Sequence, residues 1–292
     1  MTDAADTQDA TRVPFPAALP MDAEERARQR RNRIDAVARW LAPVVVMAVA
    51  IWLWDRVVVW NAIPHYILPG PGLVWESLTG DWAILWDAAL LTGRITLLAL
   101  VIAVLGGAGL AILFNQSRMV ELSLYPYAVI LQVTPVVAIA PLIFIYVDSK
   151  TAGMLLCAWI VAFFPILSNT TIGLKSADHN LSDLFTIYGA SRWQRLRFLA
   201  APSALPFFLG GLKIAGGLAL IGAVVAEFVI GRAGTGLGLA STLLEASYRF
   251  NFGRLYAALI LISLMGVAIF AAMSTVSWLA LHRWHESALK RE

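Results

Sequence analysis

Residues 175–206 read KSADHNLSDLFTIYGASRWQRLRFLAAPSALP, and residues 207–230 continue as FFLGGLKIAGGLALIGAVVAEFVI. The first segment mixes charged and apolar residues, with the apolar residues at helical spacing. The second segment is long and apolar enough to cross the hydrocarbon core of a bilayer as a helix, which needs about 20 residues. A charged segment joined directly to a membrane-length segment predicts a membrane protein with a structured loop outside the bilayer.

The charged segment predicts two short helices joined at Gly189. The first presents an apolar face made of Leu181, Leu184, Phe185 and Tyr188. Ser191 is a suitable cap for the second helix. The second helix carries Arg192, Arg195 and Arg197. An exposed apolar face beside the membrane is typical of a docking element for a partner, and the alternative is a loop that only packs against the bundle.

Outward from this segment, apolar stretches of membrane length recur along the chain. The expected spans are Val37–Val59, Ala88–Phe114, Leu122–Val147, Gly153–Leu174, Phe207–Ile230 and Leu255–Leu281. We therefore expect an all-α, polytopic membrane helix bundle of about six transmembrane helices over residues 37–285. A mostly disordered basic tail over residues 1–36 and a short tail over 286–292 flank it. Residues 60–87, rich in Pro and Trp, are expected to lie on the outer surface.

The composition supports this assignment. The 292 residues are 59% hydrophobic and 14% charged, whereas soluble domains carry about 25% charged residues. This excludes a soluble enzyme, a nucleic-acid binder and a disordered protein. The single cysteine, Cys157, excludes an internal disulfide and a cysteine zinc site. No phosphate-binding loop of the GxxxxGK[ST] type occurs, and we expect no metal, no cofactor and no catalytic residues.

The distribution of basic residues predicts the orientation. With six spans, fifteen of the 22 Lys and Arg residues lie on the side of the two termini and six on the other side, while Lys213 falls inside a span. Basic residues favour the cytoplasmic side. We therefore expect both termini in the cytoplasm of a multi-pass inner-membrane protein, with residues 175–206 on the same side.

Two spans carry small residues at every fourth position. The sets are Ala99, Ala103, Gly107 and Ala111, and Gly211, Ala215, Ala219 and Ala223. This spacing places each set on one helix face and lets helix backbones approach closely. Two interpretations remain open here, which are plain packing and smooth faces that slide during transport.

Polar residues inside the spans are candidates for a solute path. The candidates are Gln132, Thr134, Pro135, Asn169 and Glu227. Proline bends a helix and frees backbone carbonyls, which membranes tolerate where they are buried or line a water-filled cavity. The alternatives are a structural kink with Gln132 bonded to a neighbouring helix, and a Glu227 side chain that reaches water.

The quoted segment resembles the EAA loop of the permeases of bacterial ATP-binding-cassette (ABC) importers. Gly189 matches the glycine of that motif, Pro202 and Pro206 match its prolines, and Asp183-Leu184-Phe185 stands where the family has Glu-Ala-Ala. The run GLKIAGGLALIGAVVAEF resembles the helix that follows in the family, including its glutamate at Glu227. The stretches Leu68–Trp75, QVTPVVAIAPLIFIYV, FFPILSNTTIGL and GTGLGLAS extend the likeness over residues 65–285. The branch it resembles is that of nitrate, taurine, sulfonate and pyrimidine-precursor importers.

The resemblance implies a type I importer permease that acts as a homodimer or pseudo-dimer in the lipid membrane. Two ABC ATPase subunits would bind its cytoplasmic side, and a solute-binding protein would deliver a small polar or anionic solute from outside. The coupling-loop residues it implies are Asp183, Leu184, Phe185, Tyr188, Gly189, Ala190 and Pro206. The competing hypotheses are an ion-gradient-driven secondary transporter and a membrane enzyme acting on lipids.

Overall fold

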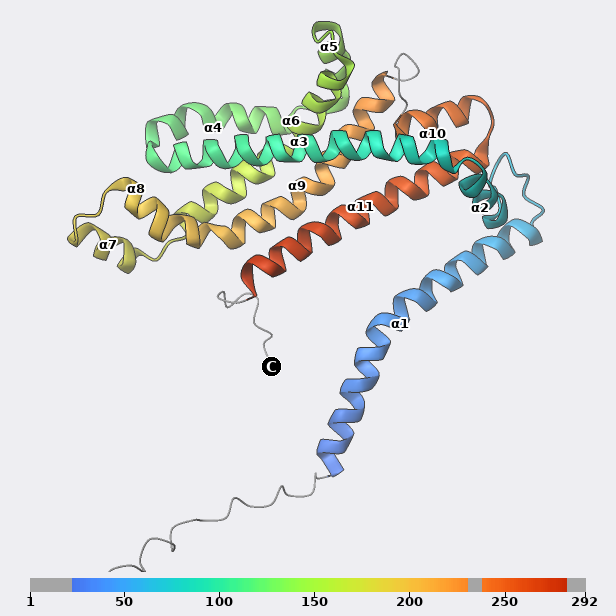
Figure 1. The fold of residues 1–292 in the computed structure, drawn as a ribbon, viewed down its shortest axis with the longest axis horizontal. Helices are drawn as coiled ribbons and strands as arrows, with labels where there is room; N and C mark the ends of the chain where they lie inside the picture. The colour runs from blue at the N-terminus through green and yellow to red at the C-terminus, as the bar shows by residue number, and fades with distance from the viewer. Residues whose placement is uncertain (1–22, 231–237, 283–292) are drawn as a thin grey trace, which may run out of the picture. The chain divides into compact units, whose positions relative to one another are not determined.

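The computed structural model describes residues 23–230 and 238–282, and within these ranges the regular structure is entirely helical (Figure 1). The chain divides into two units, residues 1–61 and 62–292, which we describe separately. The first unit contains α1 (Ala23–Trp60), whose part Leu41–Trp60 is long and apolar enough to span a membrane. The expectation of a mostly disordered tail to residue 36 is therefore wrong for residues 23–36. These residues are rich in Ala, Glu, Arg and Gln, which are strong helix formers.

The second unit contains the remaining helices. They are α2 (Pro71–Gly80), α3 (Trp82–Gln116), α4 (Arg118–Val133), α5 (Val136–Tyr146), α6 (Lys150–Lys175), α7 (His179–Ile187), α8 (Arg192–Arg195), α9 (Ala201–Ile230), α10 (Leu239–Tyr248) and α11 (Phe252–Leu281). In Figure 1, α7 and α8 lie at one end of the long helices, and α2 and α10 lie at the opposite end. The described residues provide five helices that can span a membrane, or six if α4 and α5 form one bent span.

The core of this unit consists of α6 packed between α3 and α9. The eight small residues of the two predicted stripes are all buried, which confirms that each stripe forms a packing face. A Cβ atom at Gly107 would lie 2.9 Å from Ile166 Cγ2, and one at Gly222 would lie 2.7 Å from Ala158 Cα. Both neighbours belong to α6, so small residues allow the three backbones to approach closely.

The third expected span is broken between α4 and α5. The two helices meet at an angle of 102°. Thr134 is extended (φ −70°, ψ 121°), as expected for a residue that precedes proline, and Pro135 is the N-cap residue of α5. Pro135 also lacks the N–H that would continue the ladder of α4. The sequence predicted a bend here, and the structure shows a complete break.

The second helix of the charged segment is not a separate short helix. Ser191 does cap it, because its Oγ accepts from Gln194 N and Gln194 Oε1 accepts from Ser191 N. However, α8 runs through a π turn (Leu196–Ala200) directly into α9, so that Arg192–Ile230 is one continuous helical segment. The π turn ends two residues before Pro202, whose ring in a regular α-helix would clash with the carbonyl four residues earlier.

We predict that Gly222→Ala lowers the free energy of unfolding by about 1–3 kcal/mol, because the added methyl group meets the α6 backbone and overpacks the interface. The matched control is Gly109→Ala on α3, where a Cβ meets nothing within 4 Å. The control is expected to be neutral or slightly stabilising, since Ala favours a helix over Gly. The thermal unfolding midpoint of the purified chain in detergent measures both, and equal midpoints for the two variants would contradict the packing argument.

Candidate functional site

α7 and the turn after it form a compact protruding element. Asp178 caps its N-terminus by accepting from Asn180 N at 2.7 Å. At the other end, Gly189 adopts the left-handed conformation (φ +64°), and Ala190 N donates to Phe185 O at 2.9 Å. Glycine tolerates a positive φ without strain, and this bonding pattern closes the helix end. The predicted hinge glycine therefore terminates α7 and reverses the chain into α8.

One face of α7 is apolar and exposed. Leu181, Leu184, Ile187 and Tyr188 form what we call the α7 surface. Leu184 is 45% exposed and Tyr188 is 81% exposed. The structure thus places three of the four predicted apolar residues together, while Phe185 is half-buried. Exposed apolar groups beside one another mark sites that contact other molecules.

The remaining predicted loop residues lie around this surface. Asp183 is exposed on α7, and Ala190 is half-buried after the hinge. Pro206 lies inside α9, so it belongs to the long helix rather than to a loop. Ile187 and exposed Trp193 were missed, although Ile187 follows Leu184 by three residues and shares its side of the helix.

The break between α4 and α5 borders a hollow of about 290 Å³. The predicted path residues Gln132, Thr134 and Pro135 line it together with Pro165 of α6. The Gln132 amide has no hydrogen-bond partner among the described residues, so the alternative in which it bonds a neighbouring helix is not observed. None of the described residues that line it is ionisable. The hollow can accommodate a small group that accepts or donates neutral hydrogen bonds.

Asn169 does not line this hollow in the described part of the chain. Its Nδ2 donates to Pro165 O at 2.8 Å, within α6. A Cβ atom at Gly211 of α9 would lie only 2.9 Å from the Cβ atom of Asn169. Asn169 therefore packs at the α6–α9 contact.

Glu227 is buried, with 1% of its surface exposed, and does not reach water. Its Oε1 accepts from Thr92 Oγ1 at 2.7 Å, and its Oε2 accepts from Ala240 N at 2.8 Å and Ser241 N at 3.4 Å. Thr92 Oγ1 also accepts from Leu239 N at 2.9 Å. A carboxylate from α9 and a hydroxyl from α3 thus satisfy the free N–H groups at the start of α10, where negative charge is favoured. A side chain at Gly238 would collide with the Glu227 carboxylate.

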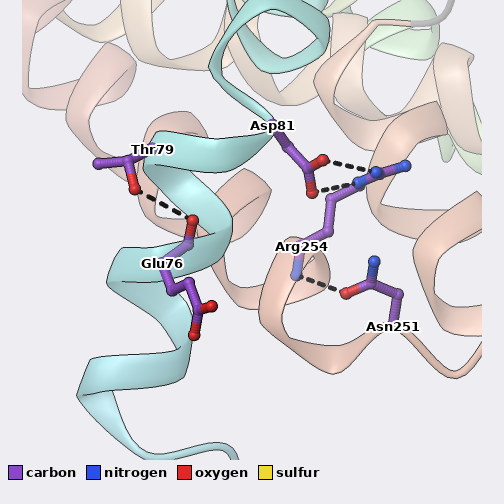
Figure 2. A network of polar contacts seen from close by, with 5 residues as sticks. All are labelled: Glu76, Thr79, Asp81, Asn251 and Arg254. Carbon is purple, nitrogen blue, oxygen red and sulfur yellow. Dashed lines mark hydrogen bonds and ion pairs between the residues drawn. The ribbon is translucent and has the colours of Figure 1, made fainter.

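A second polar contact joins the helix ends nearby. Arg254 donates from Nε and Nη2 to the two carboxylate oxygens of Asp81, each at 2.7 Å (Figure 2). Asn251 caps α11 by accepting from Arg254 N at 3.1 Å (Figure 2). Paired N–H···O bonds of this kind fix orientation as well as adding energy. The contact fastens the start of α11 to the junction of α2 and α3.

Sequence reasoning missed Thr92, Asp81 and Arg254 as partners. Thr92 and Glu227 are 135 residues apart, and Asp81 and Arg254 are 173 residues apart. The sequence does show polar residues at helix ends and inside a span. It does not show which of them pair, because that depends on how the helices pack in three dimensions.

The helices of membrane length, the broken span and the hollow beside it place the chain among polytopic helical membrane proteins. A family model described as "Binding-protein-dependent transport system inner membrane component" matches residues 103–280. The chain is 35% identical over 249 residues to the riboflavin transport system permease protein RibX of Chloroflexus aurantiacus, covering 84% of this chain and 90% of that protein. It is 32% identical over 209 residues to the formylaminopyrimidine transport permease protein ThiX of Halalkalibacterium halodurans, covering 71% and 82%.

The fold is similar to that of a solved amino acid ABC transporter with histidines, with a TM-score of 0.58 and 16% identity over 71% of this chain and 97% of that chain. The chain belongs to the family of binding-protein-dependent transport system inner membrane components. It is a permease of an ABC importer, which confirms the resemblance found in the sequence and sets aside the secondary transporter and the lipid enzyme. The expected branch is also confirmed, since permeases named for aliphatic sulfonates, nitrate and taurine are similar to it.

We predict that Thr92→Val lowers the free energy of unfolding by about 1–3 kcal/mol, because it leaves Leu239 N and one Glu227 oxygen buried without this partner. Thr96→Val is the matched control. Thr96 is equally buried on α3, but its hydroxyl donates only to Thr92 O of its own helix at 2.8 Å. Denaturant unfolding followed by circular dichroism measures both variants. A Thr96→Val cost as large as that of Thr92→Val would contradict a specific role for the Thr92 hydroxyl.

Proposed function

We propose that α7 is the element through which a separate ABC ATPase subunit drives transport by this permease. The observation that carries the proposal is the α7 surface, whose apolar side chains protrude at one end of the bundle. Removing such side chains from water against a partner is favourable, by about 25 cal/mol per Å² of apolar area. The sequence contains no nucleotide-binding loop of its own, so the ATP-hydrolysing site belongs to the partner.

α7 is connected to the membrane-length helix α9 by one turn and the short helix α8. The chain reverses at Gly189 and enters the continuous helical segment Arg192–Ile230. Arg195 Nη2 also donates to Thr186 Oγ1 at 3.1 Å, which ties the two arms of the reversal together. Displacement of α7 by the ATPase would therefore be passed to α9. A helix with continuous backbone hydrogen bonds transmits such motion as a unit.

We propose that the hollow at the α4–α5 break is part of the solute path. Gln132 and Thr134 supply an amide and a hydroxyl beside an interrupted backbone, which is the arrangement that membrane proteins tolerate around a polar cavity. The transported solute is a small polar or anionic molecule of the class that the named relatives carry, from nitrate and sulfonates to riboflavin and formylaminopyrimidine. An external solute-binding protein selects it.

Two copies of the chain would form one path, with both termini in the cytoplasm. Support for pairing comes from α9, where Phe207, Ile214, Ile221 and Phe228 recur every seven residues and are exposed. The glycines between them, Gly210 and Gly217, have open space where a side chain would be. Bulky and small residues alternating on one helix face suit close packing against another helix in a membrane. The excess of basic residues on the α7 side supports the orientation.

We predict that Leu184→Asp and Tyr188→Asp abolish association with the ATPase while the protein remains in the membrane, because a charge in the α7 surface cannot be buried without a partner. Asn180→Asp is the matched control, since it adds the same charge to the first turn of α7, where acidic residues are tolerated. Co-purification of the ATPase with the tagged permease is the measurement. Retention of the ATPase by both α7-surface variants would refute the docking proposal.

Thiol labelling tests the path. The chain has one native cysteine, Cys157, which is fully buried, so an added cysteine is readily distinguished. We predict that Thr134→Cys reacts with a membrane-impermeant, cationic methanethiosulfonate reagent in at least one of the nucleotide-free and vanadate-trapped complexes. Thr96→Cys, at a buried position of similar shape, is expected to stay unreactive. If Thr134→Cys is unreactive in both states, the hollow is not on the path.

A further inference from the structure

A second hollow, of about 400 Å³, lies behind α7. The ends of α3 and α6 and the starts of α7 and α8 enclose it. Its polar lining includes Gln116, Lys175, His179, Ser182, Arg192 and Arg195. None of the described residues that line it is acidic, although the chain as a whole has almost as many acidic as basic residues. The hollow therefore concentrates positive charge in one place.

The positive charge of the two arginines is not neutralised by the bonds they make. Arg192 Nη1 donates to the backbone oxygen of Gln116 at 3.4 Å, and Arg195 Nη2 donates to the hydroxyl of Thr186 at 3.1 Å. Both acceptors are neutral. Arg195 Nε is buried and has no hydrogen-bond partner among the described residues. A buried donor without an acceptor is rare in folded proteins and indicates a missing partner.

Lys175 is different, because it forms an ion pair with Glu121 of α4. Its charge is partly compensated, and Glu121 borders a neighbouring hollow rather than this one. The two arginines thus supply the uncompensated charge, and Lys175 fixes the end of α6 beside them.

The hollow and the α7 surface lie on opposite sides of the same helix. His179, Ser182 and Thr186 follow one another at spacings of three and four residues and share the side that faces the hollow and Arg195. Leu181, Leu184 and Tyr188 repeat the same spacing two residues later, which rotates them by about 200° around the helix. A protein bound to the α7 surface would therefore leave the hollow available to a different ligand.

We infer that this hollow binds a phosphate group, held by Arg192 and Arg195 and bordered by Lys175 and His179. Arginine forms paired, charge-assisted hydrogen bonds with phosphate oxygens and is suited to this group. The bound phosphate accepts from Arg195 Nε, the donor that lacks a partner. It bridges α8 to the ends of α3 and α6, and so fixes the base of α7. The phosphate belongs either to the headgroup of an anionic phospholipid or to a soluble phosphate compound.

The experiment compares the full-length chain with Arg192→Gln/Arg195→Gln and with the control Arg197→Gln. Arg197 is an exposed arginine of the neighbouring turn that stacks on Phe198 and does not line the hollow. One arm measures binding of inorganic pyrophosphate to the purified chain in neutral detergent by isothermal titration calorimetry. The other arm measures retained phosphatidylglycerol, with phosphatidylcholine as the neutral comparison, by native mass spectrometry.

Pyrophosphate affinity that falls at least tenfold in the double variant and is unchanged in Arg197→Gln supports the inference with a soluble ligand. Preferential retention of phosphatidylglycerol that is lost only in the double variant supports it with a lipid ligand. Binding that is absent in both arms, or that is equally affected by Arg197→Gln, overturns it. Thermal unfolding of the three proteins verifies that they are equally folded.

Discussion

α6 lies between α3 and α9, and at Gly107, Gly211 and Gly222 the space between these helices is too small for any side chain. In a bilayer the lipid tails are as apolar as the side chains, so helices gain little from hiding apolar surface from each other. Close backbone contact replaces that driving force. The three helices form a tightly packed group (Figure 1). α7 and α8 lie at one end of it and α2 and α10 at the other, while α4 packs against α3, α11 against α9, and α5 against α6 and α9. If the helices slide along the two small-residue stripes during transport, they start from this closely packed arrangement.

The two ends of α9 are built differently. At the α7 end, α9 continues through a π turn into α8, and the turn at Gly189 joins α8 to α7 with Arg195 bonded to Thr186 across it. At the other end, Glu227 is bonded to Thr92 of α3 and to the first turn of α10, and cannot move without breaking buried hydrogen bonds. α9 is therefore joined to α7 through a single turn at one end and fastened by buried hydrogen bonds at the other. The α4–α5 break at Pro135 lies beside this helix, where α5 packs against both α6 and α9.

Local features of the sequence were predictable, and pairings across the fold were not. The small-residue stripes, the Ser191 cap and the Gly189 hinge follow from spacing and residue type within a few positions. A bend at Pro135 was predictable for the same reason, but its 102° angle depends on what α5 packs against. The partners of Glu227 were hidden because they lie on α3 and α10, and burial reversed the expectation that its side chain reaches water. Three of the four residues of the α7 surface were predicted because their pattern lies within one helix, whereas Ile187 was missed and Phe185 is half-buried.

The position of Glu227 also bears on how transport is powered. A carboxylate that carries protons or sodium ions through a membrane has to alternate between an exposed and a bound state, which is why such groups face cavities. Among the side chains whose burial the structure describes, Glu227 is the one acidic group that is fully buried, and both its oxygens are occupied by donors from α3 and α10. Its hydrogen bonds serve the architecture, and none of the described residues that line the hollow beside Pro135 is ionisable. The described part of the chain thus holds its buried carboxylate fixed, which agrees with a permease that is driven from outside the membrane rather than by ions passing through it.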